Sequence, residues 1–315
     1  MSDSSVPTMQ AMVYDEFGGP EQLRLRDVPA PTPGPGEVRI RVRRAGVNPV
    51  DWKVLSGGLR GLMPHALPIV PGWDVAGVVD ALGPDVPELA VGDEVLSYAR
   101  KDWVQQGTFA ELVTVRVADV ARKPAGLSWD AAGALPLAGL TAERVLDAAG
   151  VGADDVVLVH GASGGVGTLA VQLARLRGAR VIGTGSPSGH DRLRALGAEP
   201  VAYGDGLVDA VRELAPDGVD AVVDLVGGVM EQTLAVLREG GRHASITDSS
   251  ADERGGRWVW VRPDGPRLEA LAQRAADGEL DVEIAGSFPL SDVAGAFAQS
   301  MTGATRGKLV IHVSD

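Results

Sequence analysis

The sequence predicts an α/β protein with two parts: a mostly β part and a doubly wound parallel sheet. The residues up to about 120 alternate short strand patterns with turns that contain Gly and Pro, and Glu37–Val42 has the charged–apolar alternation of a half-buried strand. After Pro124, apolar strands alternate with amphipathic helices, which indicates a parallel sheet covered on both faces. The length of 315 residues also favours two lobes, because one hydrophobic core stops growing at roughly 250–300 residues.

The first part is expected to form a compact antiparallel barrel or sandwich, since its strands are short and closely spaced. The strand candidates are Glu37–Val42, Trp73–Leu82, Glu94–Tyr98 and Phe109–Val115. Ser128 is placed to cap a helix at Trp129–Leu135, and a second helix is expected at Leu140–Ala149.

The second part contains the repeated strand–helix units. Strands are expected at Val156–His160, Arg180–Gly183, Val201–Tyr203, Ala221–Val226 and His243–Thr247, with helices at Val166–Arg177, Asp191–Leu196, Leu207–Leu214 and Met230–Leu237. The tail adds a strand at Trp258–Val261, a helix at Leu268–Ala276 and a last strand at Lys308–Val313.

Composition excludes several classes of function. The formal net charge of −13 argues against a nucleic-acid partner, which requires clustered Lys and Arg. The absence of cysteine excludes disulfides, thiolate catalysis, iron–sulfur clusters and cysteine-ligated zinc. The sequence contains no run of about 18 apolar residues, the length that a transmembrane helix requires. Met1–Gln10 also lacks the pattern of a secretory signal. We therefore expect no membrane partner and a cytoplasmic location.

The most specific local signal is the stretch from Val156 to Gly167, VVLVHGASGGVG. It has the strand–turn–helix context of a dinucleotide-binding fingerprint, with alanine at the first glycine position. The predicted pyrophosphate-binding turn comprises Ala162, Ser163, Gly164, Gly165, Val166 and Gly167. The alternative is a tight structural turn without a ligand.

A second alternative is a serine hydrolase, because Gly161–Gly165 also fits the G-x-S-x-G nucleophile elbow with Ser163 as nucleophile. Asp224 and His243 follow in the order of that class. However, the elbow is normally preceded by several strand–helix units, whereas this chain is rich in strands before it.

The cofactor preference follows from the end of the next strand. A binder of NADH places an acid there for the ribose 2′-hydroxyl, but the residues Ile182, Gly183, Thr184, Gly185 and Ser186 include none. Hydroxyls of Thr184 and Ser186 would accept a 2′-phosphate, with His190 and Arg192 nearby for charge, so the sequence favours NADPH. Alternatively, His190 and Arg192 are solvated helix residues.

Further stretches of the chain match the motifs of a known family: AGVNPVDWKVLSGG (45–58), PIVPGWDVAGVVDALG (68–83), VGDEV (91–95), GTFAELVTV (107–115), LPLAGLTA (135–142), HGASGGVG (160–167), DAVVDLVGG (220–228), VRPDG (261–265) and RGKLVIHV (306–313). In these motifs the chain resembles the zinc-independent medium-chain dehydrogenase/reductases, in particular the NADPH quinone oxidoreductase and enone reductase group. The resemblance implies a GroES-like catalytic domain formed by residues 1–122 and 258–315, with an inserted Rossmann domain at 123–257. It also implies reduction of a small-molecule quinone or enone, and a homodimer.

Two departures from related branches affect the chemistry. Zinc-dependent alcohol dehydrogenases have a cysteine ligand where this chain has Asn48, and Gly-His-Glu where it has Gly72, Trp73 and Asp74, so no metal is expected. Some quinone reductases carry tyrosines at the positions of Lys53 and Leu59. The tyrosines of this chain lie elsewhere, at Tyr14, Tyr98 and Tyr203, so the usual phenolic proton donor is absent from that place.

The resemblance places the turn Asn48–Lys53 beside the nicotinamide. Hydride transfer to an activated double bond leaves negative charge on the carbonyl oxygen, which the amide of Asn48 would stabilise. Asp51 would orient a neighbour or the cofactor, and Lys53 would contribute a cation. The alternative is a helix start, in which Asn48 caps, Pro49 opens the helix and Asp51 favours its positive end.

Further roles follow from the other motifs. Thr141 would contact the nicotinamide, Tyr203 would stack on the adenine unless it is a core residue, and Val226 with Gly227 would lie at the ribose. Ser245, Ile246 and Thr247 would lie near the nicotinamide, and Lys308 would reach the phosphates unless it is an exposed strand lysine. Trp258 and Trp260 would line an apolar substrate pocket, or serve as core or dimer packing. A crystallin-like protein that binds NADPH without turnover is the remaining alternative.

Overall fold

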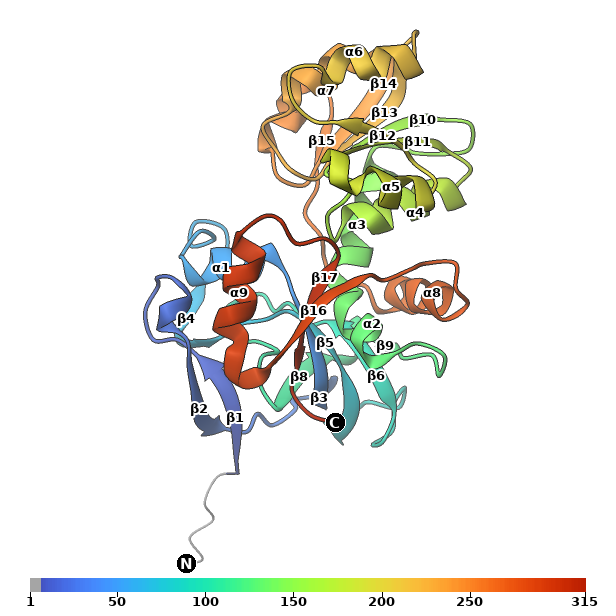
Figure 1. The fold of residues 1–315 in the computed structure, drawn as a ribbon. Helices are drawn as coiled ribbons and strands as arrows, with labels where there is room; N and C mark the ends of the chain where they lie inside the picture. The colour runs from blue at the N-terminus through green and yellow to red at the C-terminus, as the bar shows by residue number, and fades with distance from the viewer. Residues whose placement is uncertain (1–6) are drawn as a thin grey trace, which may run out of the picture. The chain divides into compact units, whose positions relative to one another are not determined.

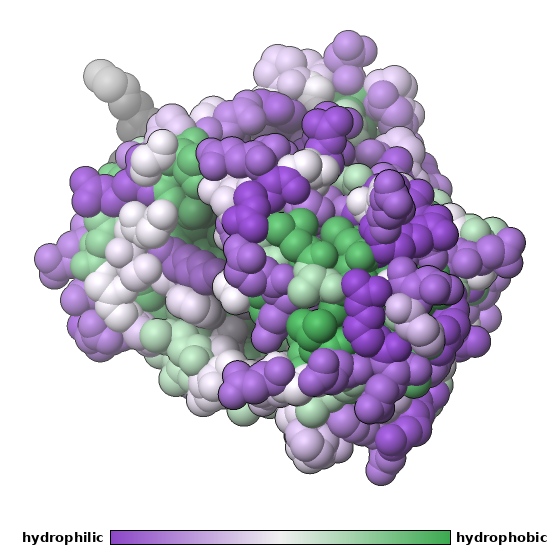
Figure 2. Space-filling view, turned by 90° about the horizontal axis from the view of Figure 1, so that it is seen from above, coloured by the Kyte–Doolittle hydropathy of each residue, from purple (hydrophilic) through white to green (hydrophobic). Residues whose placement is uncertain are grey.

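The computed structural model describes residues 7–315, which divide into two compact units. The first unit comprises the chain up to Leu137 together with Arg262–Asp315, and the second comprises Ala138–Val261 (Figure 1). The second unit is therefore inserted into the first along the chain. Hydrophilic side chains cover most of the face seen in Figure 2, as expected for a chain in which charged residues make up 23%.

The first unit is rich in strands. Its strands are β1 (Thr8–Val13), β2 (Arg24–Pro29), β3 (Glu37–Val47), β4 (His65–Val70), β5 (Asp74–Leu82), β6 (Glu94–Tyr98), β7 (Val104–Gln106), β8 (Leu112–Arg116), β9 (Val120–Arg122), β16 (Ile284–Pro289) and β17 (Lys308–His312). Its helices are α1 (Pro49–Leu55), α2 (Trp129–Ala134), α8 (Gly265–Ala276) and α9 (Val293–Met301), and α3 (Pro136–Ala148) begins there and continues into the second unit.

A seven-stranded sheet organises the first unit. Its order is β16-β17-β3-β5-β6-β9, and β8 also pairs with β3. All these pairs are antiparallel except β16 with β17, so the predicted antiparallel sandwich is corrected to a mixed sheet. Because β17 lies between β16 and β3, the C-terminal strand is an interior strand of this sheet and brings Lys308 to the end of β3, next to Asn48.

The helix α1 follows β3 directly, and local chemistry fixes its start. Pro49 occupies the first turn, where its missing N–H costs nothing. The Asp51 carboxylate accepts a hydrogen bond from the backbone N–H of Asn48 at 2.7 Å, so Asp51 closes the N-terminal end of the helix. This reading of the segment as a helix start is confirmed by the structure.

The second unit contains the parallel sheet. Its strands are β10 (Val156–His160), β11 (Arg180–Gly185), β12 (Glu199–Ala202), β13 (Val219–Asp224), β14 (Leu237–Ser245) and β15 (Arg257–Trp258). Its helices are α4 (Gly167–Leu176), α5 (His190–Ala195), α6 (Leu207–Leu214) and α7 (Met230–Val236). The strand order is β12-β11-β10-β13-β14-β15 and every pair is parallel.

This order is that of the Rossmann fold, with the reversal of strand order between β10 and β13. Figure 1 shows α4 and α5 on one face of the sheet and α6 and α7 on the other. Leu158, Ile182, Val201 and Val222 from four neighbouring strands form one buried cluster. The predicted doubly wound sheet is confirmed.

Several predicted strands end at other residues, each for a local reason. β12 stops at Ala202 rather than Tyr203, because the chain turns at Gly204, whose φ is +117°. β13 stops at Asp224 rather than Val226, because the Asp224 carboxylate accepts the N–H of Val226. Of the predicted strand Trp258–Val261, only Trp258 lies in a strand, the two-residue β15, and the carbonyl of Trp260 instead accepts a hydrogen bond from Arg144.

The predicted strand Phe109–Val115 begins only at Leu112. The backbone of Phe109 and Glu111 pairs instead with Met12 and Gln10 of β1, a strand that the sequence analysis did not predict. The unpredicted β16 and α9 likewise depend on contacts with distant segments, since β16 pairs with β17 and α9 packs against α1.

Candidate active site

The glycine-rich turn lies at the carboxyl end of β10, where the strand order reverses. Gly161 leaves the strand with a φ of +73°, and the turn continues to the start of α4 at Gly167. The turn is folded on itself by a hydrogen bond from Gly164 N to Gly161 O at 3.0 Å, and Thr168 N donates to Gly164 O at 2.9 Å. Ligands of open parallel sheets bind at this position.

The glycines of the turn meet different surroundings. A β-carbon at Gly167 would overlap the carbonyl oxygen of Gly161 and lie 2.7 Å from backbone atoms of Ala162, so the close approach of helix and strand requires glycine there. A β-carbon at Gly164 would have a single neighbour, Gly161 O at 3.4 Å. Gly164 therefore leaves space that the protein itself does not fill.

The second strand holds this turn in place. Thr184 is buried, and its hydroxyl accepts a hydrogen bond from Gly161 N at 2.9 Å while its carbonyl accepts one from Ala162 N at 3.1 Å. Gly183 is buried against the Ala162 side chain, at a distance that leaves little room for a side chain of its own. The Thr184 hydroxyl, which the sequence predicts to bind a phosphate, is thus already hydrogen-bonded to the backbone of the turn.

The segment after β11 contains the remaining residues predicted for the 2′-phosphate: Ser186 directly follows the strand, and His190 and Arg192 lie in the first turn of α5. Ser186, His190 and Arg192 are partly exposed, and the Ser186 hydroxyl lies 3.2 Å from that of Ser188. His190 Nε2 lies 3.3 Å from the carbonyl oxygen of Gly185. The glycine-rich turn lies beside this segment, because its Ser163 side chain faces Gly185 and Gly189.

Asp224 organises the edge of the sheet on the other side of the turn. One carboxylate oxygen accepts the N–H groups of Val226 and Gly227, both at 2.9 Å, and the other accepts the Ser245 hydroxyl at 2.7 Å. The Ser245 oxygen in turn accepts the N–H of Thr247 at 3.2 Å. Ile246 donates its N–H to the carbonyl of Asp224 at 3.1 Å, so the predicted ribose and nicotinamide residues form one hydrogen-bonded group.

These contacts also argue against the hydrolase alternative. The Asp224 carboxylate is used by Ser245 and the backbone, and His243 Nε2 is buried without a hydrogen-bond partner. The Ser163 hydroxyl is buried and also has none. A catalytic triad needs the three groups linked in sequence, and here they are not linked.

The aromatic residues of the second unit have different surroundings. Tyr203 is 67% exposed at the end of β12, so the core alternative for this residue is wrong. Trp258 and Trp260 pack edge to face with ring centroids 6.1 Å apart, and both are partly buried. Thr141 is buried within α3.

The first unit contains a buried polar group formed by Asn48, Asp51, Asp74 and Lys308, here called the Asn48 cluster. Asn48 Nδ2 donates to Asp74 at 2.8 Å, and Asn48 Oδ1 accepts a hydrogen bond from Lys308. Lys308 Nζ also donates to the carbonyl of Val47 at 3.1 Å and lies 3.9 Å from the Asp74 carboxylate. The exposed-strand alternative for Lys308 is wrong, because its side chain is the buried cation of this cluster.

Burial sets the ionisation of the cluster. Desolvation raises the pKa of Asp51 to about 8 and that of Asp74 to about 6, and the Lys308 ammonium only partly offsets this. Desolvation also lowers the pKa of Lys308, against the attraction of the two carboxylates. Lys53, by contrast, is exposed on α1 with its ammonium 5.6 Å from the Trp52 ring, so it does not join the cluster.

Sequence reasoning missed Asp74 as a member of this site. The motif pattern identifies Asp74 only as a departure from a zinc-binding motif, although a carboxylate within the apolar strand β5 is itself a signal of a buried partner. Asp74 is buried and accepts hydrogen bonds from Asn48 and from the backbone N–H of Leu137 at 2.8 Å.

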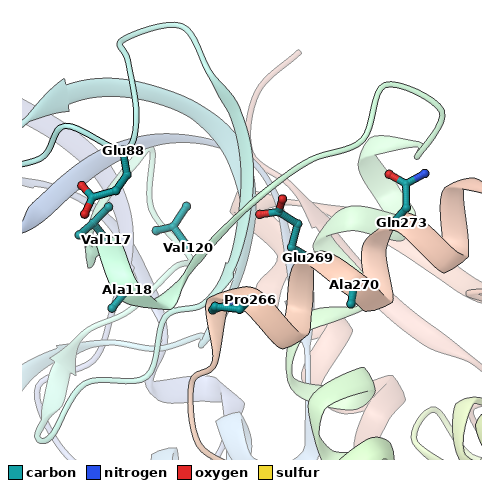
Figure 3. A pocket seen from close by; sticks show the side chains of 8 residues that line it. All are labelled: Glu88, Val117, Ala118, Val120, Pro266, Glu269, Ala270 and Gln273. Carbon is teal, nitrogen blue, oxygen red and sulfur yellow. The ribbon is translucent and has the colours of Figure 1, made fainter.

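A separate open hollow of about 660 Å³ in the first unit contains none of the predicted site residues (Figure 3). Its walls come from Val117, Val120 and Glu88 on one side and from Pro266 and Glu269 of α8 on the other. One Glu269 oxygen accepts the N–H of Arg122 at 3.3 Å. The lining offers no nucleophile or cation for chemistry.

Known proteins resemble this chain over nearly its whole length. Residues 34–125 match the alcohol dehydrogenase GroES-like domain, and residues 196–311 match a family described as zinc-binding dehydrogenase. The NADPH-dependent alkenal/one oxidoreductase of Arabidopsis thaliana is 34% identical over 99% of this chain and 81% of its own. The 2-methylene-furan-3-one reductase of Solanum lycopersicum is 35% identical over 98% and 80%.

The solved structure of the quinone oxidoreductase from Coxiella burnetii has a TM-score of 0.88 at 34% identity, covering 98% of this chain and 100% of that one. The chain belongs to the medium-chain dehydrogenase/reductase family. Within that family it falls in the quinone and enone reductase group, and it is an oxidoreductase with a nicotinamide cofactor.

One of the matched domains is described as zinc-binding, but the residues present do not suit zinc. The chain has no cysteine, and residues 7–315 contain no group of three His, Cys, Asp or Glu side chains that could hold a metal ion. At the Asn48 cluster, the Lys308 ammonium donates to Asn48 Oδ1, so a cation of the protein already occupies this oxygen. Zinc prefers thiolate, imidazole and carboxylate ligands, so this donor set does not fit it.

Proposed function

We propose that this protein is an NADPH-dependent reductase that transfers a hydride, without zinc, to a quinone or to the C=C bond of an α,β-unsaturated carbonyl compound. The main support is the glycine-rich turn at the reversal of strand order, where Gly164 leaves room for a pyrophosphate and Thr184 fixes the turn. The names of the relatives in Arabidopsis thaliana and Solanum lycopersicum support the substrate class.

NADPH is proposed over NADH for an electrostatic reason. The residues from Ile182 to Ser186 carry no carboxylate that would repel a 2′-phosphate, and the partly exposed Ser186, His190 and Arg192 offer hydroxyl and cationic partners. Tyr203, exposed at the neighbouring strand end, provides a flat face for the adenine.

Different residues of this chain would bind the cofactor and stabilise the substrate. When bound, the cofactor supplies the hydride. The group around Asp224 would shape the ribose and nicotinamide region, using Val226, Gly227 and Ser245. The amide of Asn48, fixed by Asp74 and Lys308, would face the substrate oxygen on which negative charge develops.

Trp258 and Trp260 are proposed to bind the apolar part of the substrate, and Thr141 to contact the nicotinamide. A homodimer and a cytoplasmic location complete the proposal, the former expected from the family and measurable by light scattering. Among residues 7–315, no helix has the length and apolar character needed to cross a bilayer.

The first test is calorimetric titration with NADPH and with NADH, followed by NADPH oxidation assays on a panel of enones and quinones. We expect tight binding of NADPH, much weaker binding of NADH and turnover of at least one substrate class. Absence of binding of both nucleotides would refute the assignment of the turn. Binding without turnover would instead identify a crystallin-like protein.

A further inference from the structure

The Asn48 cluster contains two buried carboxyl groups but one buried ammonium group. Asp51 is 2% exposed, Asp74 is 0% exposed and Lys308 is 5% exposed. With all three ionised, the cluster would carry an uncompensated negative charge in a medium of low dielectric constant, which is costly. A single proton on one of the carboxyl groups removes this imbalance.

The hydrogen bonds indicate which carboxyl group holds that proton. Asp74 accepts from Asn48 Nδ2 and from Leu137 N, both at 2.8 Å, and lies 3.9 Å from the Lys308 ammonium. These contacts stabilise its ionised form. Asp51 accepts one hydrogen bond, from Asn48 N to Oδ2, and its Oδ1 is buried without a partner. The unpartnered Oδ1 is where a proton costs least.

We propose that Asp51 is held as a neutral carboxylic acid and stores the proton that the reduction consumes. This inference rests on the function proposed above, since hydride addition to an enone creates an enolate that must gain one proton. The hydride forms the new C–H bond at the β-carbon, the C=C electron pair moves to the enolate, and the α-carbon then takes a proton. Asp51 gives up that proton, becomes a carboxylate facing the Lys308 ammonium, and is reprotonated from water.

The groups that face Asp51 suit this role. Asp74 and Lys308 are the charged groups that act on Asp51. The Asp51 charge in turn adds to the effect of burial in raising the pKa values of Tyr14 and Tyr98, and the Arg100 cation faces Tyr98. Both hydroxyls are buried; that of Tyr14 has no hydrogen-bond partner, whereas that of Tyr98 interacts with the Arg100 side chain. An unpartnered hydroxyl can accept a proton and pass its own onward, so Tyr14 is the residue that can relay the Asp51 proton.

Infrared spectroscopy tests the stored proton without turnover. A protonated carboxyl group has a C=O stretching band that ionised carboxylates lack. We expect this band in the wild-type protein at pH 7, with a midpoint of loss near pH 8, and its absence in Asp51→Asn. Asp80→Asn is the matched control, because Asp80 also belongs to this unit but pairs with Arg39 and Arg41, which hold its pKa below the usual range.

If Asp51→Asn does not fold, the pH titration of the wild-type band decides the question by itself. A band that is absent at pH 7, or that survives in a folded Asp51→Asn variant, overturns the proposal.

Turnover tests the use of the proton. The wild-type kcat is expected to fall as Asp51 ionises near pH 8, and Asp51→Asn is expected to lose about 10²-fold or more in kcat and to lose this pH dependence. The KM for NADPH should stay near that of the wild type. An unchanged pH profile in Asp51→Asn would refute the catalytic use of the proton. A wild-type protein with the band but without turnover of any enone or quinone would instead refute the proposed function.

Discussion

Alanine substitutions at two glycines of the turn separate its role in folding from its role in binding. A methyl group at Gly167 would overlap the carbonyl oxygen of Gly161 and press on backbone atoms of Ala162 at 2.7 Å. Neither atom can move without shifting α4 from β10, so the methyl group cannot be accommodated by a side-chain rotation. A methyl group at Gly164 would meet one atom, Gly161 O, at the ordinary contact distance of 3.4 Å.

The magnitudes differ accordingly. Gly167→Ala is expected to lower the free energy of unfolding by about 1–3 kcal/mol, the usual cost of overpacking. Gly164→Ala is expected to change it by about 1 kcal/mol or less, with a gain possible through reduced freedom of the unfolded chain. Gly164→Ala is nevertheless expected to weaken NADPH binding at least tenfold, about 1.4 kcal/mol, because the methyl group would fill the space left for the pyrophosphate.

Two measurements are sufficient: urea unfolding without ligand for stability, and calorimetric titration with NADPH for affinity. The reasoning would be refuted by Gly164→Ala binding NADPH with wild-type affinity while remaining folded. It would equally be refuted by Gly167→Ala unfolding at the wild-type urea concentration, since the backbone overlap would then cost nothing.

Three other predictions concern the buried polar contacts. Lys308→Met should lower the free energy of unfolding, measured in urea, by about 3–5 kcal/mol, because it removes the counter-ion of Asp74. Equal stability in Lys308→Met and in the exposed control Lys53→Met would contradict this prediction. Thr184→Val should lower the free energy of unfolding by about 1–3 kcal/mol and weaken NADPH binding, because Gly161 N loses its acceptor. Wild-type values in both urea unfolding and calorimetric titration would show that Thr184 does not hold the turn. Between pH 6.5 and 8, stability should fall as pH rises, because folded Asp51 with a pKa of about 8 binds a proton that the unfolded chain has already lost. His160 and Asp74, with pKa values of about 4 and about 6, affect the pH dependence of stability below that range. A wild-type stability that does not change between pH 6.5 and 8 would count against the raised pKa of Asp51.

The second unit was the more predictable part, because its signals are local. The strands of the strand–helix units pair with strands of nearby units, and the pattern from Val156 to Gly167 predicts strand, turn and helix start in a single stretch. The exact ends of strands were less predictable. They depend on contacts such as that of Asp224 with Val226, which a strand pattern does not contain.

The first unit was predicted less completely, because its partners are far apart in sequence. Asn48 and Lys308 are separated by 260 positions, and only the pairing of β17 with β3 brings them together. From the sequence, Lys308 had the pattern of a phosphate-binding or exposed lysine. Nothing near Asp74 in the sequence indicates its contact with Asn48, although a charged residue in an apolar strand does indicate that some partner exists.

The interior position of β17 has a consequence for the order of synthesis. The ribosome completes the whole second unit before it reaches Lys308, so the parallel sheet can form while the seven-stranded sheet still lacks an interior strand. Until β17 emerges, β3 is left without its partner on that side, and Asp74 has no cation. Completion of the first unit therefore waits for the last segment of the chain, and a product cut short before Lys308 would present an open strand edge of the kind that chaperones and proteases recognise.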